Sequence, residues 1–316
     1  MRYLIYGAGT IGITYGFMLS KYNEVDFLVK QKYVETFKNG IKICIKDLKN
    51  KDIDYKENTF FPNCVTEINK EYDGILVAVN RFQLEDVLKV LSEKQEYTKY
   101  FAFMQNNWNI KDEINKYIEK DKYIIAFPSS VGGGRDDKGV NVILFDEATR
   151  LGGECKFGID DLQKSLNNLG IKTKFDNNIF DWLKVHYLQQ SITAGAVLKN
   201  GSFENFSNDY NEVKKLVKAF REGIKVCKIQ GVNTNKTFPA MFFKLPMFII
   251  AHIMQKMFVE KNTVEMVNNH MKKGLPEWVV GYKEVLADGI KNGLSMSVWR
   301  SYDDAVEIYL NENRVR

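Results

Sequence analysis

The sequence predicts an α/β fold, in which a doubly wound parallel sheet is followed by an all-helical C-terminal region. Three observations predict it. A glycine-rich turn follows the first apolar run, within residues 1–12. Short apolar runs then alternate with segments of helical spacing as far as residue 177, and long helical patterns replace the strand signals from residue 178. Because 316 residues exceed what one hydrophobic core usually serves, we expect two domains, 1–177 and 178–316.

The first region alternates apolar runs with amphipathic segments, as a sheet covered by helices requires. Segments 81–91 and 110–118 carry apolar residues at helical spacing. Residues 140–145 are expected to form an antiparallel strand that extends the sheet edge, followed by a helix near 160–168 and a strand near 172–175. The six apolar runs expected as buried strands lie at 2–6, 25–29, 41–45, 74–79, 100–104 and 123–127.

The second region is expected to be helical throughout. Gly231 and Gly293 directly follow two of its helical patterns and are typical helix stop signals. The apolar run at 239–258 is interrupted by charged residues and Pro246, so we expect no membrane span there. Its aromatic and Met-rich part suits a core or the face of a possible homodimer. The expected helices lie at 180–198, 211–230, 238–258 and 278–292.

Composition narrows the class of protein. With 45% hydrophobic and 27% charged residues, the chain has ordinary globular composition. Its net charge of +5 is spread along the chain, which does not indicate a nucleic-acid partner. The four cysteines lack the spacing of a metal site, so we expect reduced thiols and no metal. The first residues enter a strand pattern directly, and a cytoplasmic protein is the expectation.

The glycine-rich turn follows a strand and opens a helix. In a GxGxxG motif, Gly7 permits the tight turn, Gly9 allows the backbone to approach a pyrophosphate, and Gly12 allows close packing of helix and strand. The N–H groups at the helix start then face the anion. This context predicts a Rossmann dinucleotide-binding domain. The predicted cofactor contacts in the turn are Gly7, Ala8, Gly9, Thr10, Ile11 and Gly12.

The end of the second strand decides which dinucleotide is expected. An enzyme that binds NAD normally offers a carboxylate there to the ribose hydroxyls. Here the strand ends at Lys30, followed closely by Lys32, and the nearby acid Asp26 lies early in the strand. Cationic side chains suit a 2′-phosphate, so NADPH is favoured over NADH. The alternative is that both lysines are ordinary solvated residues.

Polar side chains follow two further strands, where ligands bind in open α/β sheets. Asn80 follows the fourth strand and Asn106 the fifth, and either amide could bind ribose, nicotinamide or substrate. Loop and helix-cap roles suit Asn equally well. In the helical region, Lys184 follows Trp182. An ammonium there could protonate a reduced carbonyl, although periodicity alone favours a lysine that extends to solvent.

Taken together, these features resemble the ketopantoate reductase family nearly end to end. The shared pattern is an N-terminal GxGxxG, a Lys ending the second strand, Gln-Asn after the fifth, Trp-x-Lys opening the helical domain, and a Glu sixteen residues before Gly-Leu. The resemblance implies NADPH-dependent reduction of 2-dehydropantoate to pantoate, a step of pantothenate biosynthesis. It implies that Lys184 is the general acid, Glu277 the active-site glutamate that binds the substrate hydroxyl, Asn200 a substrate ligand, Asn106 a cofactor and substrate ligand, and Lys30 the 2′-phosphate contact.

The sequence also departs from the family pattern. Leu188 stands where the family has an Asn, Asn80 where it has a Lys, and Glu265 near an expected Ser. An acid near an acidic substrate would weaken binding by repulsion. The reaction class is therefore predicted more firmly than the substrate. Two alternatives stay open: a related reductase acting on another small keto or amino acid, and a dinucleotide-sensing protein without catalysis.

Overall fold

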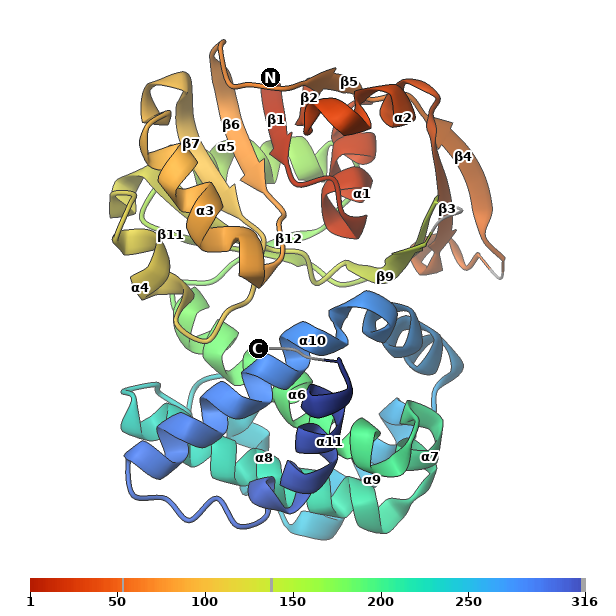
Figure 1. Ribbon diagram of the computed structural model, residues 1–316, viewed down its shortest axis with the longest axis vertical. Helices are drawn as coiled ribbons and strands as arrows, with labels where there is room; N and C mark the ends of the chain where they lie inside the picture. Colours follow the sequence, from red (N-terminus) through yellow and green to blue (C-terminus); the bar gives the residue numbers. More distant parts are fainter. Residues whose placement is uncertain (53, 137–138, 314–316) are drawn as a thin grey trace. The chain divides into compact units, whose positions relative to one another are not determined.

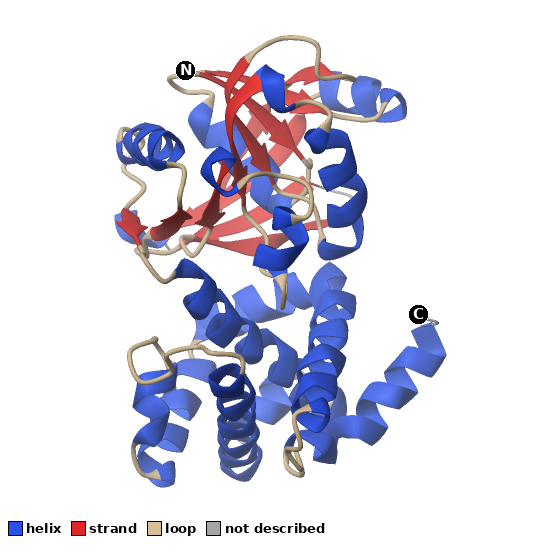
Figure 2. Cartoon of the chain, turned by 90° about the vertical axis from the view of Figure 1, so that its left-hand side faces the viewer, coloured by secondary structure: helices blue, strands red, loops and turns tan. Residues whose placement is uncertain are grey.

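The computed structural model describes residues 1–52, 54–136 and 139–313, and the chain divides into two compact units. Unit 1 comprises residues 1–106 and 110–179, and unit 2 comprises residues 107–109 and 180–316. In the described part of the chain, the strands lie in unit 1 and unit 2 is helical (Figure 2). The predicted fold class, an α/β domain followed by a helical region, is confirmed.

The larger sheet of unit 1 is built around β1 (Figure 1). Its residues Tyr3, Leu4 and Ile5 are fully buried, because parallel neighbours flank the strand and helices cover the sheet. The strand order over the described residues is β12-β11-β8-β7-β6-β1-β2-β5, with β11 antiparallel to β8. The strands are β1 (Arg2–Tyr6), β2 (Glu24–Leu28), β5 (Asn63–Val65), β6 (Tyr72–Val77), β7 (Thr98–Phe103), β8 (Tyr123–Phe127), β11 (Thr149–Gly153) and β12 (Thr173–Phe175).

A second sheet corrects two expectations. The runs 41–45 and 140–145 do form strands, but neither belongs to the larger sheet. They pair with each other in parallel, and the second also pairs antiparallel with a strand that the sequence did not predict. A local run of apolar residues predicts that a strand forms. Which strand it pairs with depends on segments that are distant in the chain. In order, this sheet holds β4 (Lys56–Phe60), β3 (Ile41–Asp47), β10 (Gly139–Leu144) and β9 (Val131–Asp136).

Helices complete unit 1, joined by short 3-10 turns. The first of them, α1, packs against the β9–β10 pair as well as against β1 and β2. This packing brings the second sheet beside the glycine-rich turn. The helices are α1 (Thr10–Leu19), α2 (Val34–Lys38), α3 (Arg81–Ser92), α4 (Ile110–Asn115) and α5 (Lys156–Asn167), with 3-10 turns η1 (Gln31–Tyr33), η2 (Leu48–Asn50), η3 (Gln95–Tyr97) and η4 (Lys120–Lys122).

Unit 2 differs from the expected helices at two places. The pattern 238–258 is divided at Leu245 and Pro246, and the helix after the break starts at Met247, because a helix start tolerates the missing N–H group of proline. The pattern 278–292 belongs to a longer helix that continues through Pro276. The helices are α6 (Ile179–Asn200), α7 (Phe203–Asn208), α8 (Tyr210–Ile229), α9 (Met247–Phe258), α10 (Lys261–Lys291) and α11 (Asp303–Asn313), with 3-10 turns η5 (Ala240–Lys244) and η6 (Trp299–Tyr302).

Among the described residues, no helix combines the length and the apolar character needed to cross a membrane.

We predict that Asp161 of α5 is needed to hold that helix on the sheet. Its carboxylate accepts hydrogen bonds at 2.8 Å from the hydroxyls of Tyr3 and Tyr100. Asp161→Ala leaves buried hydroxyls without this acceptor, so the free energy of unfolding should fall by about 2 kcal/mol or more in urea titration. The neighbouring Asp160→Ala, at an exposed position, is the control and should change stability little. Equal stability of both variants would contradict the prediction.

Candidate functional site

The glycine-rich turn between β1 and α1 has the geometry of an anion-binding turn. Gly7 has φ +114°, and a Cβ on Gly12 would lie 1.9 Å from the carbonyl oxygen of Gly7, so only glycine fits at either position. At Gly9, the N-cap of α1, a Cβ would come no closer than 4.0 Å to Ala78. The backbone therefore leaves room at Gly9 for a phosphate, beside the N–H groups that open α1.

The carboxyl end of β2 presents a cation. Lys30 is exposed and immediately precedes η1. Asp26, the acid considered from the sequence, is buried and bound by Lys70 at 2.6 Å and by Tyr72 at 2.9 Å, with Asn63 donating a further hydrogen bond. Burial opposes ionisation of Asp26, but these bonds outweigh it and hold its pKa below the ordinary value. The Asp26 carboxylate therefore stabilises the packing of β2 and is not offered to the ribose hydroxyls of a dinucleotide.

The amides after β6 and β7 differ in their surroundings. Asn80 caps α3, because its side-chain oxygen accepts a hydrogen bond of 3.1 Å from the backbone N–H of Gln83. The side-chain amides of Gln105 and Asn106 are buried and find no hydrogen-bond partner in the described parts of the chain. Buried amides without partners cost free energy. Gln105 and Asn106 therefore fit a polar ligand such as the dinucleotide or a substrate, whereas the Asn80 oxygen already has a structural role.

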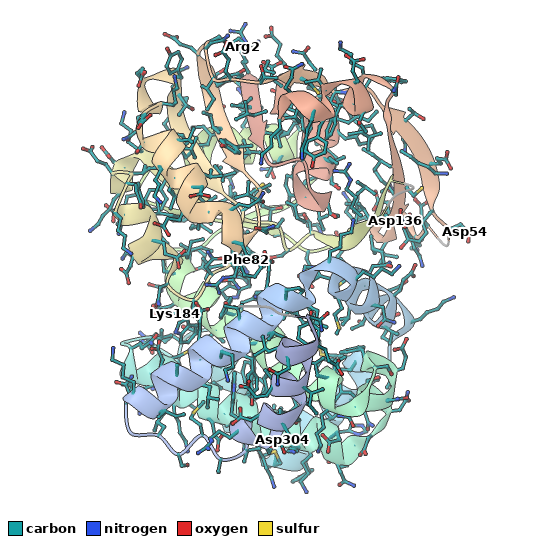
Figure 3. All side chains as sticks on the ribbon, viewed as in Figure 1. Arg2, Asp54, Phe82, Asp136, Lys184 and Asp304 are labelled. Atoms are coloured by element: carbon teal, nitrogen blue, oxygen red, sulfur yellow. The ribbon has the colours of Figure 1, made fainter. Side chains whose placement is uncertain are left out.

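Lys184, labelled in Figure 3, lies near the start of α6 in unit 2. The side chain is half-buried. Its Nζ lies 4.4 Å from the ring centroid of Trp108 and donates hydrogen bonds to the side-chain oxygens of Asn109, at 3.3 Å, and Gln230, at 2.5 Å. Periodicity alone favoured a lysine that extends to solvent. The structure instead places this ammonium in a polar cluster over an aromatic ring.

A carboxylate on α10 anchors this cluster. Asp288 accepts hydrogen bonds of 2.6 Å from Trp108 Nε1 and from Gln230 Nε2. Trp108 also stacks on Tyr187, one turn from Lys184 on α6, with ring centroids 5.8 Å apart. The Gln230 amide thus receives a hydrogen bond from Lys184 and donates one to Asp288, which fixes which way the amide faces. Among residues 107–109 and the described part of 180–316, these contacts define a lysine site.

The structure does not bring every predicted residue to this lysine site. Asn200 ends the helix that carries Lys184, and sixteen residues of α-helix span about 24 Å. Its amide donates instead to Ala196 O, at 2.8 Å, and to Glu212. A small substrate bound at Lys184 therefore cannot reach Asn200, because one rigid helix separates them.

Glu277 lies on α10, the helix that carries Asp288. The two lie eleven residues apart, about 16.5 Å along the axis, and they share one face because eleven residues are just over three whole turns. Leu188, where the family pattern has an Asn, is fully buried in the core of unit 2. An amide side chain expected near Lys184 is thus replaced by a leucine that packs in the core.

Four residues of the lysine site were missed from the sequence: Trp108, Asn109, Gln230 and Asp288. Trp108 and Asn109 directly follow the Gln-Asn pair after β7, so an aromatic residue among amides at a strand end was the available signal. Gln230, at the C-cap of α8, and Asp288, on α10, carried no local signal, since both positions are ordinary for polar residues.

The first half of the chain matches a known protein family. Residues 3–153 match the family model described as ketopantoate reductase PanE/ApbA. The resemblance to the ketopantoate reductase family is thereby confirmed. No curated protein matches the chain.

Solved structures share the fold over almost the whole chain. D-mandelate dehydrogenase, in a ternary structure with NADH and anilino(oxo)acetate, is 17% identical with a TM-score of 0.72, and 99% of each chain is covered. A probable 2-dehydropantoate 2-reductase from Bacillus subtilis is 13% identical with a TM-score of 0.70, covering 98% of this chain and 99% of that one. A dimeric ketopantoate reductase from Staphylococcus aureus is 12% identical with a TM-score of 0.70, covering 99% of each. At these identities the likeness establishes the fold.

We predict that Asp288→Ala loosens the lysine site. The indole N–H of Trp108 and the amide of Gln230 lose their shared acceptor, so the free energy of unfolding should fall by about 1–3 kcal/mol in urea titration. Asp304→Ala, at an exposed position on α11, is the matched control and should lie within about 0.5 kcal/mol of the wild type. A loss no larger than the control's would show that Asp288 does not anchor the cluster.

Proposed function

We propose that this chain is an NADPH-dependent reductase that converts a 2-oxo acid to a 2-hydroxy acid, with Lys184 as the general acid. The observation that carries the proposal is the placement of the Lys184 ammonium between Trp108, Asn109 and Gln230. Such an ammonium can donate a proton to a carbonyl oxygen and stabilise the negative charge that develops there. The family likeness of residues 3–153 supports the same reaction class.

The cofactor side of the proposal uses unit 1. When bound, the dinucleotide supplies the hydride that reduces the carbonyl carbon. The turn from Gly7 to Gly12 and the start of α1 bind its pyrophosphate, and Lys30 binds the 2′-phosphate that distinguishes NADPH. Residues Gln105 and Asn106 offer buried amides to the nicotinamide or the substrate. The Asn80 contact with the cofactor stays a prediction, since its oxygen caps α3.

The substrate side uses residues that follow β7 in the chain and residues of α6 and α10. Asn106 and Asn109 are three residues apart, so the chain itself keeps their Cα atoms within about 11 Å. An amide that meets the substrate and the amide that holds Lys184 are thus carried by one short segment. The Glu277 contact with the substrate hydroxyl stays a prediction, since Glu277 lies about 16.5 Å along α10 from Asp288. Asn200 is left out because of its separation along α6.

Within this reaction class we propose 2-dehydropantoate as the substrate and pantothenate biosynthesis in the cytoplasm as the setting. Another small keto acid is the second candidate, because Leu188 replaces an amide of the family pattern and a mandelate dehydrogenase shares the fold. A dinucleotide sensor would not need an ammonium fixed as Lys184 is. An assay of NADPH oxidation against a panel of 2-oxo acids separates these candidates, since a sensor binds NADPH without turning over any of them.

We predict that Lys184→Ala lowers kcat by about 100-fold or more on the best 2-oxo acid of that panel, because the general acid is lost. NADPH binding, measured by fluorescence titration, should stay within about twofold, since Lys184 is assigned no cofactor contact. Lys218→Ala, at an exposed position on α8, is the control and should keep wild-type turnover. Unchanged turnover of Lys184→Ala would eliminate the assigned role.

We also propose a homodimer formed through the apolar face of η5 and α9. Large side chains are exposed there, including Phe248 at 65% and Met257 at 60%. A patch of this kind on unit 2 fits a protein–protein contact, and a dimeric relative exists in Staphylococcus aureus.

Light scattering coupled to size exclusion tests the dimer. The measured mass of the wild type should be twice the chain mass of 36.6 kDa, and Phe248→Ser should lower the measured mass toward that of the monomer. Phe61→Ser removes an equally exposed aromatic residue from unit 1, at 66% exposure, and should leave the mass unchanged. A monomeric wild type would contradict the proposed dimer.

A further inference from the structure

Arg135 lies on β9, the strand of the second sheet that packs against α1. Its guanidinium Nη1 donates a hydrogen bond of 2.6 Å to the backbone carbonyl of Ala8, although 127 residues separate the two in the chain. Ala8 is the middle residue of the tight turn that begins at Gly7. The second sheet therefore delivers a cation to the glycine-rich turn itself.

A second contact places the same guanidinium toward the end of β2. Its central carbon lies 5.8 Å from the ring centroid of Phe37, a buried residue of α2. The short turn η1 connects α2 to Lys30. Arg135 thus touches both the turn that opens α1 and the helix that follows Lys30. In Rossmann domains the adenosine ribose lies between these two places, on the side away from the nicotinamide.

The guanidinium has donors to spare for a ligand. It carries five N–H groups in a fixed planar arrangement. Over residues 1–52, 54–136 and 139–313, the structure gives it one hydrogen bond, to a neutral carbonyl, and no carboxylate partner. Arg135 is half-buried, so its charge is not fully exposed to solvent. A phosphate would satisfy the remaining donors and neutralise the charge, and guanidinium binds phosphate through paired hydrogen bonds.

We propose that Arg135 is a second cation, beside Lys30, that binds the 2′-phosphate of the adenosine ribose and so sets the preference for NADPH over NADH. The inference rests on the proposed dinucleotide-dependent function and adds a specificity residue to it. The hydrogen bond to Ala8 orients the guanidinium, which also lies over the ring of Phe37. Asp136, the next residue along β9, marks this end of the strand in Figure 3.

Binding measurements without substrate test the proposal. Dissociation constants for NADPH, NADH, adenosine 2′,5′-bisphosphate and AMP are determined by calorimetry for the wild type and for Arg135→Gln. The variant should bind NADPH and the bisphosphate about 10-fold or more weakly, with NADH and AMP changed by less than about twofold, because one charged hydrogen-bonding group is lost. Arg2→Gln, at the opposite end of β1 and labelled in Figure 3, should match the wild type with all four ligands.

Each other outcome overturns the inference in its own way. Equal weakening of NADPH and NADH would place Arg135 at the pyrophosphate or in support of the turn. Unchanged binding would remove it from the pocket. A wild type that binds NADH as tightly as NADPH would refute the 2′-phosphate contact and leave the reductase proposal standing, whereas a wild type that binds neither would refute the proposed function as well. Arg135→Lys keeps a positive charge at this position and serves as the second variant if Arg135→Gln folds poorly. It should retain part of the wild-type preference for NADPH over NADH.

Discussion

The position of the Lys184 ammonium depends on Trp108. The indole ring gives the cation a face to lie against, at 4.4 Å, and its N–H is fixed by a carboxylate on another helix. A lysine on a helix surface would otherwise sample many rotamers, and holding it in one costs side-chain entropy. Stacking on Tyr187 and the hydrogen bond to Asp288 orient the ring, so the amine meets a prearranged surface.

Trp108 belongs to a three-residue segment of unit 2 that interrupts the sequence of unit 1. Residues 107–109 group with unit 2, while the residues on both sides of them group with unit 1. The buried amides of Gln105 and Asn106, which find no hydrogen-bond partner among the described residues, come immediately before this segment. One loop after β7 thus carries residues that fit a ligand and residues that position the proposed acid. Because the two sets of residues are neighbours in the chain, its covalent geometry limits the distance between them, in addition to packing.

In unit 1, the corresponding constraint is the close approach of α1 to β1. No side chain fits between Gly12 and the carbonyl of Gly7, and the helix start is therefore brought directly over the strand end. The β9–β10 pair packs against the same helix, and Arg135 of β9 reaches the turn. A change that pushed α1 outward would disturb the phosphate-binding turn and the proposed 2′-phosphate contact together.

The sequence by itself determined the features that depend on neighbours in the chain. The GxGxxG turn, the strand β2 that ends before Lys30, and the helical character of unit 2 follow from local patterns, because turn geometry and periodicity are set within a few residues. The choice of Lys184 came from the family pattern.

Only the tertiary structure decided which distant segments meet. It assigned β3 and β10 to a second sheet, brought Arg135 to Ala8 and Asp288 to Trp108, and separated Asn200 from Lys184 along one helix. A polar residue on a strand or helix looks the same in sequence whether it faces water or a partner more than a hundred residues away. Its role is fixed by packing between elements, which no local pattern records.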